Sequence, residues 1–185
     1  MAGDPSPAEP VTAPFLLRPI HHVGFHVPDL RAAIDTWVTV YGAGPFYLLE
    51  HVTFDECTYG GAPATADHSA GFGQCGALPI ELQQYHDVQP AELARPLTAD
   101  DRTAVNHVGV TADDPAAESA RLQSLGFGLC LYTRLGDTEF FWHDATEAFG
   151  YTIEVISAGP RFDAFWDAVA HGARDWDGRD PVRSA

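Results

Sequence analysis

One short pattern occurs twice in this chain, and it constrains the possible fold more than any other feature of the sequence. The residues HVGF at 22–25 recur as HVGV at 107–110. A second pair follows, because PIEL at 79–82 matches TIEV at 152–155. Self-similarity of this kind indicates one structural unit present in two copies, which build a common core.

Each copy predicts the element order βαβββ. The alternating residues 21–27 predict a strand. Asp29 is then a suitable N-cap, and Gly42 ends a helix whose apolar residues recur at helical spacing. In the second copy Asp114 and Gly126 take the same places, and three strands follow in each half. We therefore expect an α+β fold in which two tandem βαβββ modules form a curved mixed sheet around one cleft, followed by a C-terminal helix.

The segments outside the repeat set the expected boundaries. Residues 1–17 are rich in Pro, Ala and acidic side chains, which predicts a disordered tail. Residues 56–71 predict a turn-rich loop, which explains why Glu81 follows His22 at a greater spacing than Glu154 follows His107. The expected parts are thus the tail, a first module at 18–86, a polar linker at 87–104, a second module at 105–157, and a C-terminal helix and tail at 158–185.

Charge and cysteine content exclude several classes of partner. The formal net charge of -16 argues against nucleic acid and anionic membranes, whose phosphates would be repelled. No apolar run approaches the roughly 20 residues that a membrane-spanning helix needs. The three cysteines show no CxxC spacing, which argues against a disulfide framework or a thiolate zinc site. We expect a cytoplasmic protein.

Four polar side chains are predicted to point inward from the strands. Residues i and i+2 share one face of a strand, so each histidine lies on the same face as the glycine of its pattern. Burying His and Glu costs on the order of several kcal/mol unless they are paired or bind a metal. Two imidazoles and two carboxylates suit one divalent ion such as Zn²⁺, Ni²⁺, Co²⁺, Mn²⁺ or Fe²⁺. The predicted ligands are His22, Glu81, His107 and Glu154.

These motifs and the duplication resemble the vicinal oxygen chelate superfamily over residues of about 19–157. The superfamily includes glyoxalase I, methylmalonyl-CoA epimerase, extradiol dioxygenases, and fosfomycin- and bleomycin-resistance proteins. The set of one His or Glu per strand is most similar to glyoxalase I and the epimerase. The resemblance implies the same four ligands, a small-molecule substrate with a carbonyl or vicinal oxygens, and a homodimer.

The resemblance also implies a reaction. It favours an isomerase, epimerase or lyase that abstracts a proton next to a carbonyl while the metal stabilises the enolate. Glu154 matches the epimerase base on the last strand, Glu50 is the candidate for a second base on the second strand, and Glu81 is a third candidate. Two alternatives stay open: an iron(II)-dependent extradiol-type dioxygenase using His22, His107 and Glu154, and a metal-free small-molecule binding or resistance protein.

Several chemically capable residues lack a counterpart in the other half of the repeat. The unrepeated histidines are expected at surface or loop positions by default, with one of them, His143, also a candidate for the mouth of the substrate site. They are His51, His68, His86 and His143. The aromatic residues of the predicted strands are expected mainly in the core, and some of them along a large apolar pocket.

Overall fold

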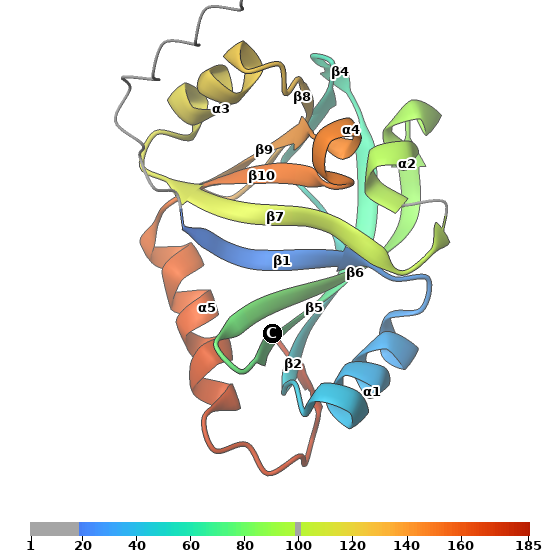
Figure 1. Cartoon of the computed structure of the whole chain (residues 1–185), viewed down its shortest axis with the longest axis vertical. Coiled ribbons are helices and arrows are strands. Elements are labelled where there is room, and N and C mark those ends of the chain that lie inside the picture. The colour runs from blue at the N-terminus through green and yellow to red at the C-terminus, as the bar shows by residue number, and fades with distance from the viewer. Residues whose placement is uncertain (1–18, 99–100) are drawn as a thin grey trace, which may run out of the picture.

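The computed structural model describes residues 19–98 and 101–185, and the predicted tail at 1–17 lies outside these residues. Within the described chain, the strands form one sheet with the order β11-β2-β5-β6-β1-β7-β10-β9-β8-β3-β4. Helices lie around its periphery (Figure 1). The α+β fold expected from the sequence is confirmed.

The first module contains the strand that opens the repeat, a helix, and three more long strands. A short hairpin, β3–β4, is inserted between the first and second of these three strands. The bounds are β1 Ile20–His26, α1 Leu30–Tyr41, β2 Phe46–Val52, β3 Glu56–Tyr59, β4 Ala62–Pro63, β5 Thr65–Cys75 and β6 Leu78–Gln89.

The second module repeats this order after a short helix. The bounds are α2 Ala91–Thr98, β7 Ala104–Ala112, α3 Pro115–Ser124, β8 Leu129–Leu135, β9 Thr138–Asp144, α4 Thr146–Phe149 and β10 Thr152–Ser157. The chain then forms α5 Pro160–Ala173 and β11 Val182–Ser184, which pairs with β2 in parallel.

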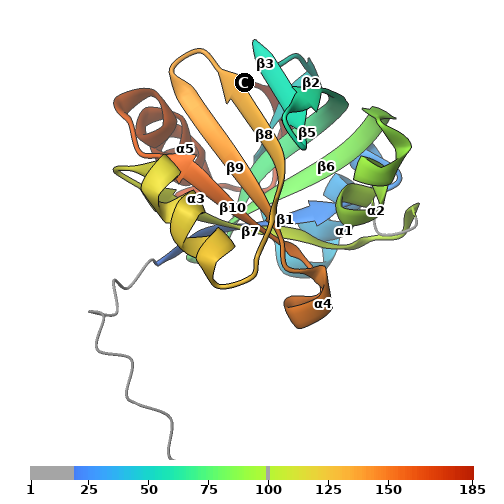
Figure 2. The ribbon, with the colours of Figure 1, turned by 90° about the horizontal axis from the view of Figure 1, so that it is seen from above.

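An approximate twofold relation centres on the antiparallel pair β1–β7. On one side β6 runs parallel to β1, and on the other side β10 runs parallel to β7. The order β1-β6-β5-β2 is thus matched by β7-β10-β9-β8. In Figure 2 the sheet curls, with β8 and β9 rising on one side and β5 and β6 on the other. The last strand of each module therefore lies beside the first, which brings the four predicted ligands to the centre.

Local chemistry sets the two repeated helices as expected. The Asp29 carboxylate accepts a hydrogen bond from the Ala32 amide at 3.0 Å, and Gly42 ends α1 in the left-handed conformation. The Asp114 carboxylate caps α3 in the same way, ahead of Pro115. Helix α1 buries its apolar face in a cluster on the outer side of the first module; its members are Val27, Leu30, Ile34, Ala43, Phe46, Ile80 and Leu82.

Two segments differ from the expectation. The predicted loop at 56–71 instead forms β3, β4 and the first half of β5, and β3 pairs with β8 of the second module. The predicted polar linker at 87–104 contains the end of β6, helix α2 and the start of β7. Both segments join one apolar cluster, in which Leu93 and Leu97 of α2 pack near Trp142. The polar composition of both segments predicted a loop and a linker instead. A few apolar residues are enough to anchor such short elements on the cluster.

Helix α5 packs on the body of the chain, over β5. Phe162, Trp166 and Val169 are buried against Ile156 and the aromatic rings of Phe72 and Phe140. Across the described residues, no helix combines the length and apolar character needed to cross a membrane.

Candidate metal centre and substrate cavity

Two histidines from the repeated pattern face each other at the centre of the sheet. His22 of β1 lies opposite Gly109 of β7, and His107 of β7 lies opposite Gly24 of β1. Their Nε2 atoms are 2.9 Å apart. A Cβ atom at Gly24 would overlap the His107 ring, and one at Gly109 would overlap the His22 ring. The glycine of each copy therefore makes room for the histidine of the other.

The two glutamates flank this pair from the adjacent strands. Glu81 of β6 is in register with Gly24, and Glu154 of β10 with Gly109. The Glu81 Oε2 atom is 3.4 Å from His22 Nε2 and 3.5 Å from His107 Nε2. The Glu154 Oε2 atom is 3.5 Å from each of the same two nitrogens. All four residues are buried, with exposed fractions of 7% or less.

This donor set fits a divalent cation. Ligand atoms bound at about 2.0–2.2 Å to one ion lie roughly 3–3.5 Å from each other, which is the spacing found here. His22, Glu81 and His107 offer atoms that all lie within 4.8 Å of one another. Glu154 is outside that mutual set although it is close to both imidazoles, so its carboxylate approaches them from a different side than Glu81 does.

The electrostatics of the cluster also favour a cation. Burial raises the pKa of Glu154, and the neighbouring Glu81 carboxylate adds to that effect, while His22 opposes it. Burial acts in the same direction on Glu81, but the adjacent His107 and His22 imidazoles outweigh it and hold the pKa of Glu81 below its usual range. Two adjacent buried carboxylates thus resist carrying two charges at once, and a dication would compensate both.

Side chains around the cluster fix the orientation of the ligands. Asn106 Oδ1 accepts a hydrogen bond from His107 Nδ1 at 2.7 Å, and the Asn106 amide donates to the Leu97 carbonyl. This arrangement leaves the His107 Nε2 lone pair free for a metal. On β6 the Gln83 amide donates to Glu81 Oε1 at 2.9 Å, and the Tyr85 hydroxyl donates to Gln83 at 3.0 Å.

Replacing Asn106 by Ala is expected to weaken metal binding by about 10–100-fold, since the variant removes the acceptor that holds the His107 tautomer. Titration of the metal-free protein with Co²⁺ or Zn²⁺ would measure the change. Asn106→Asp keeps an acceptor at the same place and should retain most of the affinity. Equal affinity in Asn106→Ala and the native chain would contradict this role.

Tryptophan rings cover both histidines. Trp166 of α5 lies against His22 with ring centres 5.1 Å apart, and Trp142 of β9 lies against His107 at 4.8 Å. His21, whose Nδ1 is 3.1 Å from His22 Nδ1, packs between Phe162 and Trp166. These contacts place two fluorophores beside the candidate metal centre, so a paramagnetic ion is a usable spectroscopic probe of occupancy.

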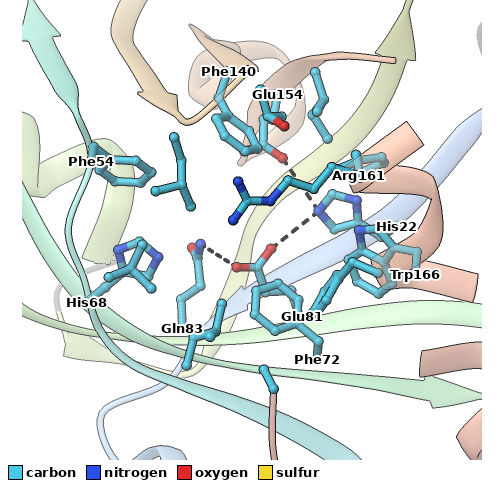
Figure 3. A pocket seen from close by; sticks show the side chains of 18 of the residues that line it. His22, Phe54, His68, Phe72, Glu81, Gln83, Phe140, Glu154, Arg161 and Trp166 are labelled. Atoms are coloured by element: carbon cyan, nitrogen blue, oxygen red, sulfur yellow. Dashed lines mark hydrogen bonds and ion pairs between the residues drawn. The ribbon is translucent and has the colours of Figure 1, made fainter. Parts of the chain in front are cut away.

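A cavity of about 380 Å³ opens beside the cluster, and His22, Glu81 and Glu154 form part of its wall (Figure 3). Its size lies within the range of small-molecule sites. Most of the lining is apolar, and the aromatic contribution comes from four separate segments of the chain. These side chains include Phe54, Phe72, Phe140, Trp142, Phe165 and Trp166.

The structure brings one unrepeated histidine into this cavity. His68 of β5 is buried, lines the cavity, and contacts the Ala66 carbonyl through Nδ1 at 3.0 Å. The expectation of a surface or loop position for His68 is therefore wrong, because the predicted loop is a strand. His143 of β9 is also buried, with Nδ1 3.0 Å from the Phe127 carbonyl, and it is not among the residues that line the cavity. A surface or loop position, or a place at the mouth of the substrate site, was therefore the wrong expectation for His143. His51 and His86 are exposed, as expected.

Glu50 does not join the other candidate residues. Its side chain on β2 is 66% exposed and pairs with Arg31 of α1 at 3.3 Å, whereas the neighbouring Leu49 lines the cavity. Successive side chains of a strand point to opposite faces, so Leu49 occupies the inward position and Glu50 the outward one. The structure thus places Glu50 away from the site in which a catalytic base would act.

Besides His68, the sequence reasoning gave no role in the site to three polar residues. Asn106 had a detectable signal, since it precedes the repeated histidine directly. Gln83 lies two residues after Glu81 and shares its face, which was also visible in the strand alternation. Arg161 of α5 lines the cavity without any signal in the repeat, because α5 lies outside both modules.

Comparisons with known proteins agree with this fold. Residues 21–140 match the model of the Glyoxalase/Bleomycin resistance protein/Dioxygenase superfamily, in line with the resemblance inferred from the sequence. A comparison with curated protein sequences gave no match.

Several solved structures are similar. Methylmalonyl-CoA epimerase from Mycobacterium tuberculosis is 20% identical, with a TM-score of 0.52 over 78% of this chain and 91% of that chain. A Streptomyces coelicolor methylmalonyl-CoA epimerase variant in complex with 2-nitronate-propionyl-CoA is 16% identical, with a TM-score of 0.51 over 77% of this chain and 96% of that chain. A hypothetical protein from Bacillus halodurans is 12% identical, with a TM-score of 0.51 over 77% and 96%. At these identities the likeness establishes a shared fold.

Proposed function

Because the chain belongs to the glyoxalase/bleomycin resistance protein/dioxygenase superfamily, we propose that it is a divalent-metal-dependent enzyme of the isomerase, epimerase or lyase type. It would move a proton next to a carbonyl group. The observation that carries this proposal is the convergence of His22, Glu81, His107 and Glu154 at the wall of an apolar cavity. Buried donors of this kind without a partner would be costly to the fold.

The proposed ligands of the ion are the two imidazole Nε2 atoms and the carboxylates of Glu81 and Glu154. A bound Zn²⁺, Ni²⁺, Co²⁺, Mn²⁺ or Fe²⁺ would supply Lewis-acid stabilisation of negative charge on a substrate oxygen. The protein contributes the rest: Asn106 and Gln83 hold the ligands in place, and the aromatic wall excludes water from the reacting group.

A separate residue is available to transfer the proton. Glu81 and Glu154 were the expected bases, but a carboxylate that binds a cation is less basic. His68 lies in the same cavity, and Gln83 lies between it and Glu81 in Figure 3. The Nδ1–H group of His68 donates a hydrogen bond to the Ala66 carbonyl, which leaves the Nε2 lone pair of His68 to accept a proton. Burial lowers the pKa of His68, so the ring is neutral and able to act as a base. We therefore assign the proton transfer to His68.

The cavity favours a compact substrate. Its volume of about 380 Å³ accommodates a small molecule with a carbonyl or vicinal oxygens at one end. An acyl-CoA ester is suggested by the names of the similar structures, but this chain has only ten basic residues and a net charge of -16. That balance is poorly suited to the phosphates of CoA. The homodimer inferred from the resemblance stays a prediction.

Metal content and proton exchange test the proposal together. The native protein is expected to hold about one equivalent of a divalent metal per chain, and to exchange a substrate proton with D₂O for a member of a panel of 2-oxo acids, hydroxyketones and acyl-CoA esters. Glu154→Ala should lose most of the metal and of the exchange. Glu50→Ala removes a carboxylate from the outer face of β2 and should keep both the metal and the proton exchange. Exchange that survives complete removal of the metal would contradict the proposal.

A second candidate follows from the donor set itself. The sequence predicted this ligand set with Glu154, whereas the structure groups Glu81 most closely with His22 and His107. Two histidines and one carboxylate are the ligand type of non-haem iron(II) oxygenases. Anaerobic loading with Fe²⁺ followed by oxygen uptake with catechols distinguishes this function from proton transfer. Oxygen consumption without proton exchange would favour the dioxygenase.

A further inference from the structure

Arg161 is the single arginine or lysine among the residues that line the cavity in the described part of the chain. It extends from the first turn of α5 over the cavity, as Figure 3 shows. Its Nη1 atom lies 2.8 Å from the position that a Cβ atom would take at Gly136, in the turn between β8 and β9. The Arg161 side chain thus extends from α5 to this turn, and its guanidinium lies beside the turn.

Within the described residues, no acidic group forms an ion pair with Arg161. The ion pairs found in the described residues hold other arginines, such as Arg31 with Glu50, Arg121 with Glu118, and Arg134 with Asp55. No carboxylate in that part of the chain lies within ion-pair distance of Arg161. The protein has 26 acidic and ten basic residues, so acidic partners for an arginine are abundant. A guanidinium that faces an apolar cavity without such a partner in the described residues therefore points to a negatively charged ligand.

The charges in the cavity wall determine which ligand it can accept. Glu81 and Glu154 are acidic groups of the lining, and a dication bound to both carboxylates would neutralise them. Among the side chains of the lining, Arg161 then remains as the one uncompensated positive charge. A single guanidinium binds a carboxylate through two parallel hydrogen bonds, whereas a di- or triphosphate would need more cations than this lining offers.

We propose that the substrate is an apolar monocarboxylate, with its carbonyl or vicinal oxygens at the His/Glu cluster and its carboxylate on Arg161. This inference rests on the proposed function for the identity of the reacting end. The aromatic rings of Phe72, Phe140 and Phe165 surround the body of such a molecule. Arg161 determines specificity in this arrangement, and the reacting atoms lie at the cluster.

A matched pair of probes tests this inference. The compound para-(hydroxyacetyl)benzoate carries vicinal oxygens at one end of an aromatic ring and a carboxylate at the other, and hydroxyacetophenone lacks the carboxylate. Calorimetry on the metal-loaded protein should give at least about tenfold tighter binding of the charged probe, since hydrogen bonds between ions are stronger than neutral ones. Arg161→Met should abolish this preference and leave the affinity for hydroxyacetophenone unchanged.

The control is Arg174→Met, which removes an arginine at the other end of α5, outside the cavity lining. It changes the net charge of the protein by the same amount and should keep the preference. The inference is overturned if the native protein binds both probes equally or fails to bind the charged probe at millimolar concentration. It is also overturned if Arg161→Met keeps the preference, or if Arg174→Met loses it equally.

The same samples separate this inference from the proposed function, because both probes carry exchangeable protons next to a carbonyl. An Arg161-dependent preference without proton exchange would contradict the proposed reaction and leave the carboxylate selectivity standing. Exchange with both probes at equal affinity would support the reaction and overturn the role of Arg161.

Discussion

Gly24→Ala is expected to lower the metal affinity of the protein by at least about 100-fold. This loss exceeds the roughly 10–100-fold that removal of a hydrogen-bond partner of a metal ligand typically costs. The new methyl group would occupy the space of the His107 imidazole, which faces Gly24 across the β1–β7 pair. The ring must then rotate away from the other ligands. Metal titration followed by quenching of tryptophan fluorescence with Co²⁺ measures this loss, because Trp142 and Trp166 contact the two histidines.

Two further glycine variants complete this experiment. Gly109→Ala should have the same effect, because its methyl group would overlap His22. Gly128→Ala is the matched control, since a Cβ atom there meets nothing within 4 Å. Overpacking also costs about 1–3 kcal/mol of stability, so the melting temperature and the circular dichroism of each variant must show a folded protein. Native metal affinity in folded Gly24→Ala and Gly109→Ala would refute the proposed geometry of the site.

His68→Gln is expected to reduce kcat by about 10²–10⁴-fold while the metal content stays at its native level. The substitution removes the imidazole Nε2 that would accept the proton, and it leaves the four proposed ligands in place. Proton exchange rates measured at saturating substrate give kcat, and elemental analysis of the same samples gives the metal content. The expected change therefore falls on kcat and separates His68 from the ligands, whose loss removes metal as well.

The fold provides a close control for His68. His143 is equally buried and also contacts a backbone carbonyl through Nδ1, but it does not line the cavity. His143→Gln should cost similar stability and preserve kcat. Equal losses of kcat in the two variants would indicate a structural role for His68, and native kcat in His68→Gln would remove it from the mechanism.

The repeat predicted most of the architecture and the four candidate ligands. Recurrence of His22 and His107, and of Glu81 and Glu154, placed one residue of each type in each module. Caps such as Asp29 and Gly42 then set helix boundaries that the structure reproduces. The predictions of the fold, of the helix boundaries and of the convergence of these four side chains succeeded because strand alternation, capping and internal symmetry are each encoded over short stretches of chain.

The position of Glu50 shows where such reasoning fails. Its assignment as a base depended on which face of β2 points inward, and a shift of one residue exchanges the two faces. The pairing of β2 with β5 decides this, with Leu49 opposite Ala70. Because β5 was hidden in a segment rich in turn-forming residues, the sequence offered no register against which to place Glu50 or His68.

By itself, the sequence determined that two βαβββ units share one centre and that a histidine and a glutamate from each unit meet there. Only the tertiary structure decided which unrepeated groups join them. His68 reaches the cavity through the pairing of β5 with β6, and Arg161 through the packing of α5 on the sheet. The physical reason is that symmetry repeats local patterns, whereas the burial of a single side chain depends on contacts between segments that are distant in the chain.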